Sequence, residues 1–174
     1  MEKGLIQVYT GNGKGKTTAA LGLALRAVGH GLKVLVIQFL KGNIRYGEFE
    51  SHKKLSPYLT IKQTGREAFV SRTNPDPVDI KLVQDGFALA KKAIAEKEYD
   101  IVILDEINVA LDLKLIKLQQ VIDIIKKKPD NVEIILTGRN APEEIIDLAD
   151  LVTELKDIKH PFHKGFKARK GIEY

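Results

Sequence analysis

Residues 5–18 read LIQVYTGNGKGKTT, an apolar run with β-branched residues that leads into a loop rich in glycine and lysine. The run at residues 5–9 has the composition of a buried strand. Residues 17–30 are apolar on almost every side and end before Gly31, which predicts a helix buried against a sheet. A strand, a glycine-rich loop and a helix in this order are typical of a phosphate-binding P-loop. The stretch therefore predicts an α/β fold with a phosphate site at the start of its first helix.

The loop contains the residue types that hold phosphates. Its glycines let backbone N–H groups turn toward phosphate oxygens, and the helix N-terminus adds partial positive charge. Lys16 contributes a full charge, and the Thr17 hydroxyl is a suitable Mg²⁺ ligand. Thr10 stands where the usual motif has its first glycine, so we expect an unusual placement of the nucleotide; a plain glycine-rich turn is the alternative. The candidate ATP-binding residues of the loop are Gly11, Asn12, Gly13, Lys14, Gly15, Lys16, Thr17 and Thr18.

Along the rest of the chain, short β-branched runs alternate with segments of helical period, which is typical of repeated βα units. Strands are predicted at residues 5–9, 33–40, 59–63, 101–104, 132–137 and 151–155, and helices at residues 17–30, 47–55, 80–96, 111–125 and 142–148. With 174 residues, one domain is expected over residues 1–174. We predict an α/β, single-domain P-loop NTPase-like (RecA-like) fold with a mostly parallel sheet of about six strands flanked by helices.

The composition narrows the class of protein. Hydrophobic residues make up 44% of the chain and charged residues 29%, as in ordinary globular domains. The sequence has no cysteine, which excludes disulfides, thiolate catalysis and cysteine-bound zinc and is typical of a reducing compartment. No apolar stretch approaches the ~20 residues of a membrane span, and the first residues lack the apolar core of a signal peptide. We therefore expect a cytoplasmic protein that does not enter a membrane.

Two strand ends add candidate ligands to the loop. Residues 101–106 read IVILDE, an apolar strand that ends in Asp105 and Glu106. Carboxylates at this place in P-loop enzymes lie beside the magnesium ion, so both are candidate metal ligands together with Thr17; the alternative is that they only begin a loop. Arg139 follows the strand at residues 132–137, at the sheet edge where α/β proteins bind ligands. It is a candidate phosphate ligand, or else a solvated surface arginine.

The net charge of +5 is concentrated near the C-terminus. Residues 156–174 contain six lysines and arginines but two acidic residues, which indicates an anionic partner, either small-molecule phosphates or nucleic acid. We expect this basic tail to fold onto the site. His160 and His163 have no third ligand at a suggestive spacing, so a solvated or substrate-facing tail is favoured over a metal site. Residues 65–77 are predicted to form a long loop, which favours a functional role for its only aromatic residue, Phe69.

Three passages resemble one enzyme family. They are YTGNGKGKTTAA at residues 9–20, LDE at residues 104–106, and LTGR at residues 136–139 continued by DLAD at residues 147–150. The ending at residues 159–174, KHPFHKGFKARKGIEY, is similar as well. Together they resemble the P-loop type of ATP:corrinoid adenosyltransferase, which attaches the adenosyl group of ATP to the cobalt of cobalamin or a precursor corrinoid. The resemblance covers the chain from Leu5 onward, and the variant loop together with this ending is far more specific than a P-loop alone.

The resemblance implies a particular reaction. In this family, a Co(I) corrinoid attacks the 5′ carbon of ATP and expels triphosphate, while ATP lies reversed in the P-loop. The cobalt nucleophile carries no proton, so the reaction requires no general base. The resemblance assigns Lys16, Thr17 and Glu106 to catalysis. Lys16, Thr17 and Mg²⁺ stabilise the leaving triphosphate, and Glu106 is preferred over Asp105 as the carboxylate ligand.

The resemblance also implies a corrinoid site with aromatic contacts. Residues 65–71, GREAFVS, match the family segment that covers the lower face of the corrin, and Phe69 matches its phenylalanine. The companion tryptophan is missing, because the chain has no tryptophan and Ser71 stands in its place. Phe162 of the tail is the second corrinoid-binding candidate.

The resemblance also implies protein partners. A homodimer is expected, together with a reductase or flavodoxin-like protein that donates an electron to cobalt. Many relatives have an N-terminal arm that closes over the site. This chain begins almost at its first strand, so we expect the cover to come from the basic tail or a second subunit, or the site to be more open.

Two other functions fit parts of the pattern. A P-loop nucleoside or nucleotide kinase would use the same cradle, but thymidine-kinase-like proteins carry a cysteine-bound zinc, and Thr10 fits ordinary phosphoryl-transfer loops less well. A nucleic-acid-stimulated ATPase would use the basic tail and would bind strands with a steep salt dependence. Aromatic residues make up only 6% of the chain, which leaves little for base stacking, so no nucleic-acid partner is expected.

Overall fold

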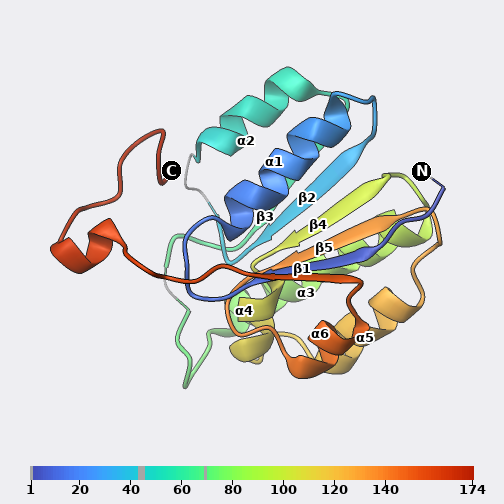
Figure 1. The fold of residues 1–174 in the computed structure, drawn as a ribbon. Helices are drawn as coiled ribbons and strands as arrows, with labels where there is room; N and C mark the ends of the chain where they lie inside the picture. The colour runs from blue at the N-terminus through green and yellow to red at the C-terminus, as the bar shows by residue number, and fades with distance from the viewer. Residues whose placement is uncertain (1, 43–45, 69) are drawn as a thin grey trace.

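The computed structural model describes residues 2–42, 46–68 and 70–174. Its centre is a six-stranded sheet with strand order β3-β2-β4-β5-β1-β6, in which all neighbouring strands are parallel (Figure 1). The strands are β1 (Ile6–Thr10), β2 (Val34–Phe39), β3 (Leu59–Thr64), β4 (Ile101–Asp105), β5 (Glu133–Thr137) and β6 (Leu151–Glu154). The predicted α/β fold with a parallel sheet is therefore confirmed.

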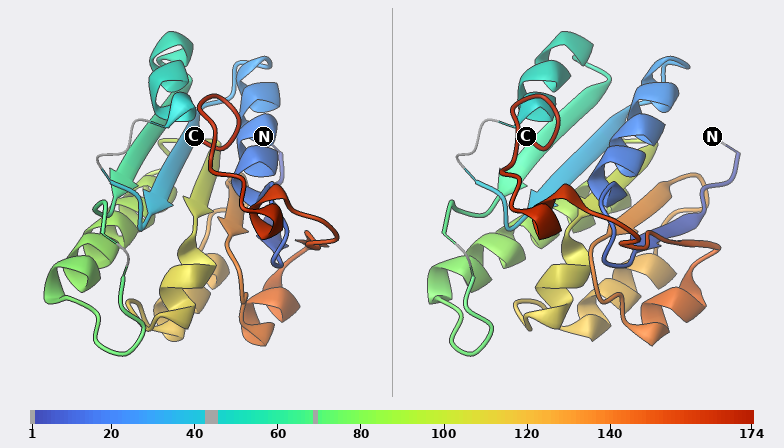
Figure 2. Two further views of the ribbon diagram at one scale, coloured as in Figure 1. Left: turned by 90° about the vertical axis from the view of Figure 1, so that its left-hand side faces the viewer. Right: turned by 60° about the vertical axis from the view of Figure 1, so that its left-hand side comes forward.

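Helices cover both faces of the sheet. They are α1 (Lys16–Val28), α2 (Gly47–Ser51), α3 (Pro77–Ala95), α4 (Ile107–Asp112), α5 (Leu118–Lys126) and α6 (Glu143–Leu148), with short 3₁₀ turns η1 (His52–Leu55) and η2 (Pro161–Lys164). Figures 1 and 2 show α1 and α2 on one face and α3, α4, α5 and α6 on the other. Successive side chains of a strand point to opposite faces of the sheet, so each strand contributes to both layers. In β2, Leu35 and Ile37 pack toward α3 and α5, whereas Val34 and Val36 pack with the alanines of α1.

The first helix packs against the sheet, as the sequence predicts, but it buries only one side. In α1 the buried apolar residues are Ala20, Ala24 and Ala27, which lie on one stripe against the sheet. Leu25, on another side of the helix, is 59% exposed. Small side chains on the packed stripe let the helix lie close to the strands, while Leu21 and Leu23 flank this stripe and are partly buried. The helix therefore covers the sheet on one side only.

The prediction of one helix over residues 111–125 is also wrong. The chain forms α4 and α5 with a break between them, where Lys114 has a left-handed backbone with φ of 58°. Leu115 and Ile116 in this break are nevertheless buried. The apolar spacing matched one helix because the connecting segment also places its side chains in the core, a tertiary effect that the helical period cannot distinguish. Pro129 follows α5, as expected from the sequence.

The carboxyl ends of the strands meet at one edge of the sheet. The P-loop leaves β1 there, and the chain takes left-handed backbone angles directly after two neighbouring strands, at Leu40 beyond β2 and Glu106 beyond β4. In Figure 1 the tail also returns to this edge, toward which the strand arrows point. The sheet edge is therefore where the candidate site residues gather.

No helix in residues 2–42, 46–68 and 70–174 combines the length and apolar content needed to cross a bilayer.

Candidate functional site

The P-loop is packed against the segment that follows β6. The backbone N–H of Gly13 donates to the carbonyl oxygen of Leu155 at 2.7 Å. A Cβ atom on Gly13 would lie 2.6 Å from the carbonyl oxygen of Lys156, so only glycine fits at this position. Gly15, the N-cap of α1, has φ of 116°, a left-handed angle that also favours glycine. The conformation of the P-loop therefore depends on its packing against residues 155 and 156 as well as on the backbone angles that phosphate binding requires.

Lys16 is held inside this loop. Its side-chain Nζ donates to the carbonyl oxygens of Gly11 and Gly13, both at 2.7 Å, and the residue is 8% exposed. Burial lowers the pKa of Lys16, while the carboxylate of Glu106 acts in the opposite direction. The charge of Lys16 thus lies beside the N-terminus of α1, whose partial positive charge also favours an anion.

Thr10, the last residue of β1, links the start of the P-loop to the loop that follows the neighbouring strand β5. Its side-chain Oγ1 accepts a hydrogen bond from the backbone N–H of Ala141 at 3.3 Å. Ala141 lies just beyond Arg139, in the loop that follows β5. The threonine that replaces the usual glycine therefore ties together the two loops that carry Lys16 and Arg139.

Asp105 lies at the centre of a buried hydrogen-bond network. Its Oδ1 accepts from Thr17 Oγ1 at 2.8 Å and from Thr137 Oγ1 at 2.7 Å. Its Oδ2 accepts from Lys41 Nζ at 2.8 Å and from Gln38 Nε2 at 3.4 Å, and the residue is fully buried. Burial lowers the pKa of Lys41, but the attraction of Asp105, aided by Glu106 and Glu48, outweighs burial and the pKa is raised. Asp105 thereby connects α1, β5 and the end of β2.

Glu106 has a different environment from its neighbour. Its backbone is left-handed, with φ of 66°, and its N–H donates to Thr137 Oγ1 at 3.0 Å. Its side chain borders the cavity at the sheet edge. Burial, together with the nearby charge of Asp105, raises the pKa of Glu106, and Lys41 partly offsets this. Such strain and a raised pKa in one residue are typical of a functional position.

Removing the charge of Glu106 is expected to stabilise the metal-free protein. A carboxyl whose pKa is raised above its ordinary value of 4.5 makes the folded state less stable at any pH where it is ionised. Glu106→Gln should therefore raise the free energy of unfolding at neutral pH. The gain should fade as the pH falls below the ordinary value, since the carboxyl is then protonated in both states. Urea unfolding with EDTA at about pH 8 and about pH 4 would measure this, and an equal gain at both pH values would contradict it.

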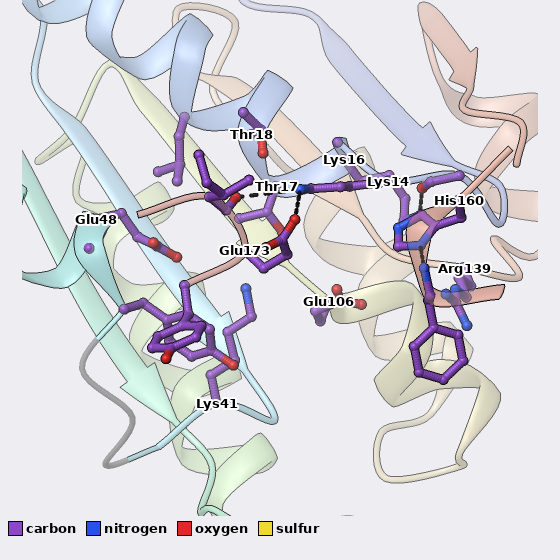
Figure 3. A pocket seen from close by; sticks show the side chains of 18 of the residues that line it. Lys14, Lys16, Thr17, Thr18, Lys41, Glu48, Glu106, Arg139, His160 and Glu173 are labelled. Carbon is purple, nitrogen blue, oxygen red and sulfur yellow. Dashed lines mark hydrogen bonds and ion pairs between the residues drawn. The ribbon is translucent and has the colours of Figure 1, made fainter. Parts of the chain in front are cut away.

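A cavity of about 1200 Å³ brings most of the predicted site residues together. Figure 3 shows Lys14, Lys16, Lys41 and Arg139 with Glu106 around this space. The exposed side chain of Phe162 also lines it, whereas Phe69 lies outside the described residues. Of the predicted residues, the structure groups Asn12, Gly13, Lys14, Gly15, Lys16, Thr17, Thr18, Glu106, Arg139 and Phe162 around the cavity, with Gly11 and Asp105 behind its wall.

The oxygen donors of this cavity fit a magnesium ion bound with a nucleotide. Thr17 and Glu106 both line it, and hydroxyl and carboxylate oxygens are ligands that Mg²⁺ prefers. Within the part of the chain that the structure describes, no three His, Cys, Asp or Glu residues form a metal cluster. A hard cation held by one or two protein oxygens, with phosphates and water as its other ligands, matches this donor set.

The family follows from the sequence of the whole chain. The family profile described as "ATP:corrinoid adenosyltransferase BtuR/CobO/CobP" matches residues 2–174. This chain belongs to the ATP:corrinoid adenosyltransferase family. A corrinoid adenosyltransferase of Sinorhizobium is 41% identical over 99% of this chain and 81% of its own length, and one of Escherichia coli is 40% identical over 99% and 87%. The predicted family resemblance is confirmed.

Solved structures support the fold of this adenosyltransferase family member. A KaiC-like protein from Pyrococcus horikoshii has a TM-score of 0.58 at 16% identity, over 90% of this chain and 74% of its own. The flagellar accessory protein FlaH from Methanocaldococcus jannaschii has a TM-score of 0.54 at 16% identity, over 88% and 72% of the two chains. At this identity the likeness shows the P-loop NTPase fold alone.

Sequence reasoning missed several residues of the adenosyltransferase site. Lys41, Tyr46 and Glu48 line the cavity from the end of β2 and from α2, opposite the P-loop. Lys41 follows a predicted strand, so the rule that pointed to Arg139 could have found it. Glu173 of the tail has no such signal. It forms an ion pair with Lys14 at 2.8 Å, a contact between residues 159 positions apart.

Proposed function

We propose that this chain transfers the 5′-deoxyadenosyl group of MgATP to the Co(I) of cobalamin or a precursor corrinoid. The observation that carries the proposal is a cavity of about 1200 Å³ that is lined by the P-loop with Lys16. Ligand pockets usually measure ~300–1,000 Å³, so this volume leaves room for a second substrate beside the nucleotide. Family membership supports the same reaction.

The reaction forms a cobalt–carbon bond and breaks the bond between the 5′ carbon and its oxygen. The electron pair of that bond leaves with the triphosphate, so the protein has to stabilise negative charge on a leaving group. Lys16 and the N-terminus of α1 are placed for this task. Cobalt is the nucleophile and carries no proton, so no general base is assigned.

A magnesium ion would be held by Thr17 Oγ1 and Glu106. When bound, it would neutralise charge on the triphosphate oxygens. Asp105 already accepts hydrogen bonds from Thr17, Thr137 and Lys41, so we assign it to orienting Thr17 and not to direct ligation. Arg139 lines the same cavity as Lys16 and is assigned to the nucleotide phosphates.

The corrinoid is assigned to the tail side of the cavity. Phe162 is 73% exposed there and offers an apolar surface to the corrin ring. Phe69 is retained as the second contact on the strength of the family resemblance alone. We further assign residues 156–174 to covering the site, because Glu173 of this segment contacts Lys14 of the P-loop.

An anaerobic assay tests the proposed function. The protein is mixed with MgATP and chemically reduced cobalamin, and the corrinoid spectrum and the phosphate products are followed together. Light-sensitive adenosylcobalamin should appear with one equivalent of triphosphate. If ADP forms without a cobalt–carbon product, the chain transfers a phosphoryl group instead and the proposal fails.

The remaining assignments concern the surroundings of the enzyme. We propose a cytoplasmic homodimer that receives electrons for cobalt from a reductase or flavodoxin-like protein. Sedimentation of the purified chain would test the dimer, and a flavodoxin-dependent assay without chemical reductant would test the electron donor.

A further inference from the structure

The backbone at the end of β2 is held in an unusual conformation around Lys41. Leu40, directly before it, is left-handed with φ of 60°, which is uncommon for a residue with a branched apolar side chain. Gly42, directly after it, packs against the end of β3, where an added Cβ atom would lie 1.9 Å from the carbonyl oxygen of Gly65. The positions on both sides of Lys41 are therefore constrained, and the direction of its side chain is set by the fold.

The side chain of Lys41 contacts Asp105 at the wall of the cavity. Lys41 Nζ lies 2.8 Å from Asp105 Oδ2, with 16% of the lysine side chain and 1% of the aspartate side chain exposed. The ring of Tyr46 is 5.3 Å from the same Nζ. Glu106 and Glu48 also act on its charge. An ion pair this buried holds its geometry far better than a surface pair does.

The contacts form a continuous path from Lys41 to the P-loop. Lys41 makes the shorter of two contacts to Asp105 Oδ2, at 2.8 Å against 3.4 Å for Gln38 Nε2, while Thr17 Oγ1 donates to Asp105 Oδ1 at 2.8 Å. With both oxygens bound from different elements, the carboxylate cannot rotate freely. The proton of Thr17 is therefore directed toward Asp105, and the lone pairs of its oxygen remain for a ligand in the cavity.

We propose that Lys41 is a positioning residue for MgATP. It acts through Asp105 to hold the Thr17 hydroxyl in the orientation that accepts a nucleotide-bound Mg²⁺. The inference rests on the proposed function only in taking MgATP as the ligand. A direct contact between Lys41 and the nucleotide phosphates is the rival that the experiment has to separate.

The experiment measures binding in the absence of corrinoid. ATP binding is followed by calorimetry at increasing Mg²⁺ concentration for the unmodified chain, Lys41→Met and Lys41→Arg. Loss of a residue that orients a metal ligand lowers metal affinity ~10–100-fold, so Lys41→Met should raise the half-saturating Mg²⁺ concentration at least about tenfold. Lys41→Arg keeps a cation for Asp105 and should shift it less than about threefold. Unchanged Mg²⁺ dependence in Lys41→Met would overturn the proposal.

A double-substitution cycle identifies the path. If Lys41 acts through Asp105, adding Lys41→Met to Asp105→Asn should change the half-saturating Mg²⁺ concentration less than about twofold. Thr17→Ala serves as a second background and should give the same result, because it removes the hydroxyl at the end of the path and avoids any folding defect of Asp105→Asn. A full additional shift in the Thr17→Ala background would mean direct contact with the nucleotide and would overturn the positioning role.

Failure of the two proposals can be told apart. If Lys41 and Thr17 are coupled in Mg²⁺-dependent ATP binding but no adenosylcobalamin forms, the proposed function fails and the role of Lys41 stands. If adenosylcobalamin forms while the substitutions at Lys41 and Thr17 are additive, the role of Lys41 fails and the proposed function stands.

Discussion

Replacing Lys16 with alanine is expected to lower kcat/KM for adenosyl transfer by about 10³-fold, equivalent to ~4 kcal/mol of transition-state stabilisation. The Lys16 ammonium lies within the loop, 2.7 Å from the carbonyl oxygens of Gly11 and Gly13. Negative charge develops on the triphosphate as its bond to the 5′ carbon breaks. A cation already held in a largely buried loop can stabilise that charge and keeps one N–H donor free of the loop carbonyls, whereas alanine offers neither charge nor donor.

Lys14→Ala is the matched control for this substitution. Lys14 lies in the same loop, but 43% of its side chain is exposed and it pairs with Glu173. Because exposed charges are screened by water, its loss should cost less than about tenfold in kcat/KM. Anaerobic single-turnover rates, with circular dichroism to verify folding, would compare the two variants. Near-normal turnover in Lys16→Ala would contradict the role given to Lys16.

Replacing Glu106 with glutamine is expected to raise the half-saturating Mg²⁺ concentration at least about tenfold and to lower the transfer rate about 10²-fold at limiting Mg²⁺. Glutamine keeps the size of the side chain but loses the charge that attracts the cation. Glu106 borders the cavity, whereas the oxygens of Asp105 are occupied by four protein donors. Because loss of the residue behind a ligand also weakens Mg²⁺ binding, the two carboxylates have to be compared in their effect on stability as well.

Asp105→Asn provides the comparison, because its effect on stability should be opposite. It leaves the buried Lys41 cation without its carboxylate, and breaking such a pair costs ~3–5 kcal/mol. Glu106→Gln, in contrast, should stabilise the metal-free protein at neutral pH. Transfer assays over a Mg²⁺ series, paired with urea unfolding, would test both statements. An unaltered Mg²⁺ requirement in Glu106→Gln would exclude Glu106 as a ligand.

The P-loop, the parallel sheet and the family could all be predicted from the sequence. A phosphate loop is a local structure, so the order of residues from Leu5 to Thr18 contains all the information needed to recognise it. The apolar runs were equally informative, because strands buried on both faces read as continuous hydrophobic segments. Glu106 and Arg139 could be named because each follows such a run.

The tertiary structure alone decided which of these groups act on one another. Lys41 and Asp105 are 64 positions apart, and Lys14 and Glu173 are 159 apart, so no local pattern relates them. Strand order determines the first contact, since β2 and β4 are adjacent in the sheet, and the path of the tail determines the second. The break after α4 has the same origin. The periodicity of apolar residues along the sequence shows which side chains can be buried. The packing of distant segments decides where the backbone turns and which charged groups come into contact.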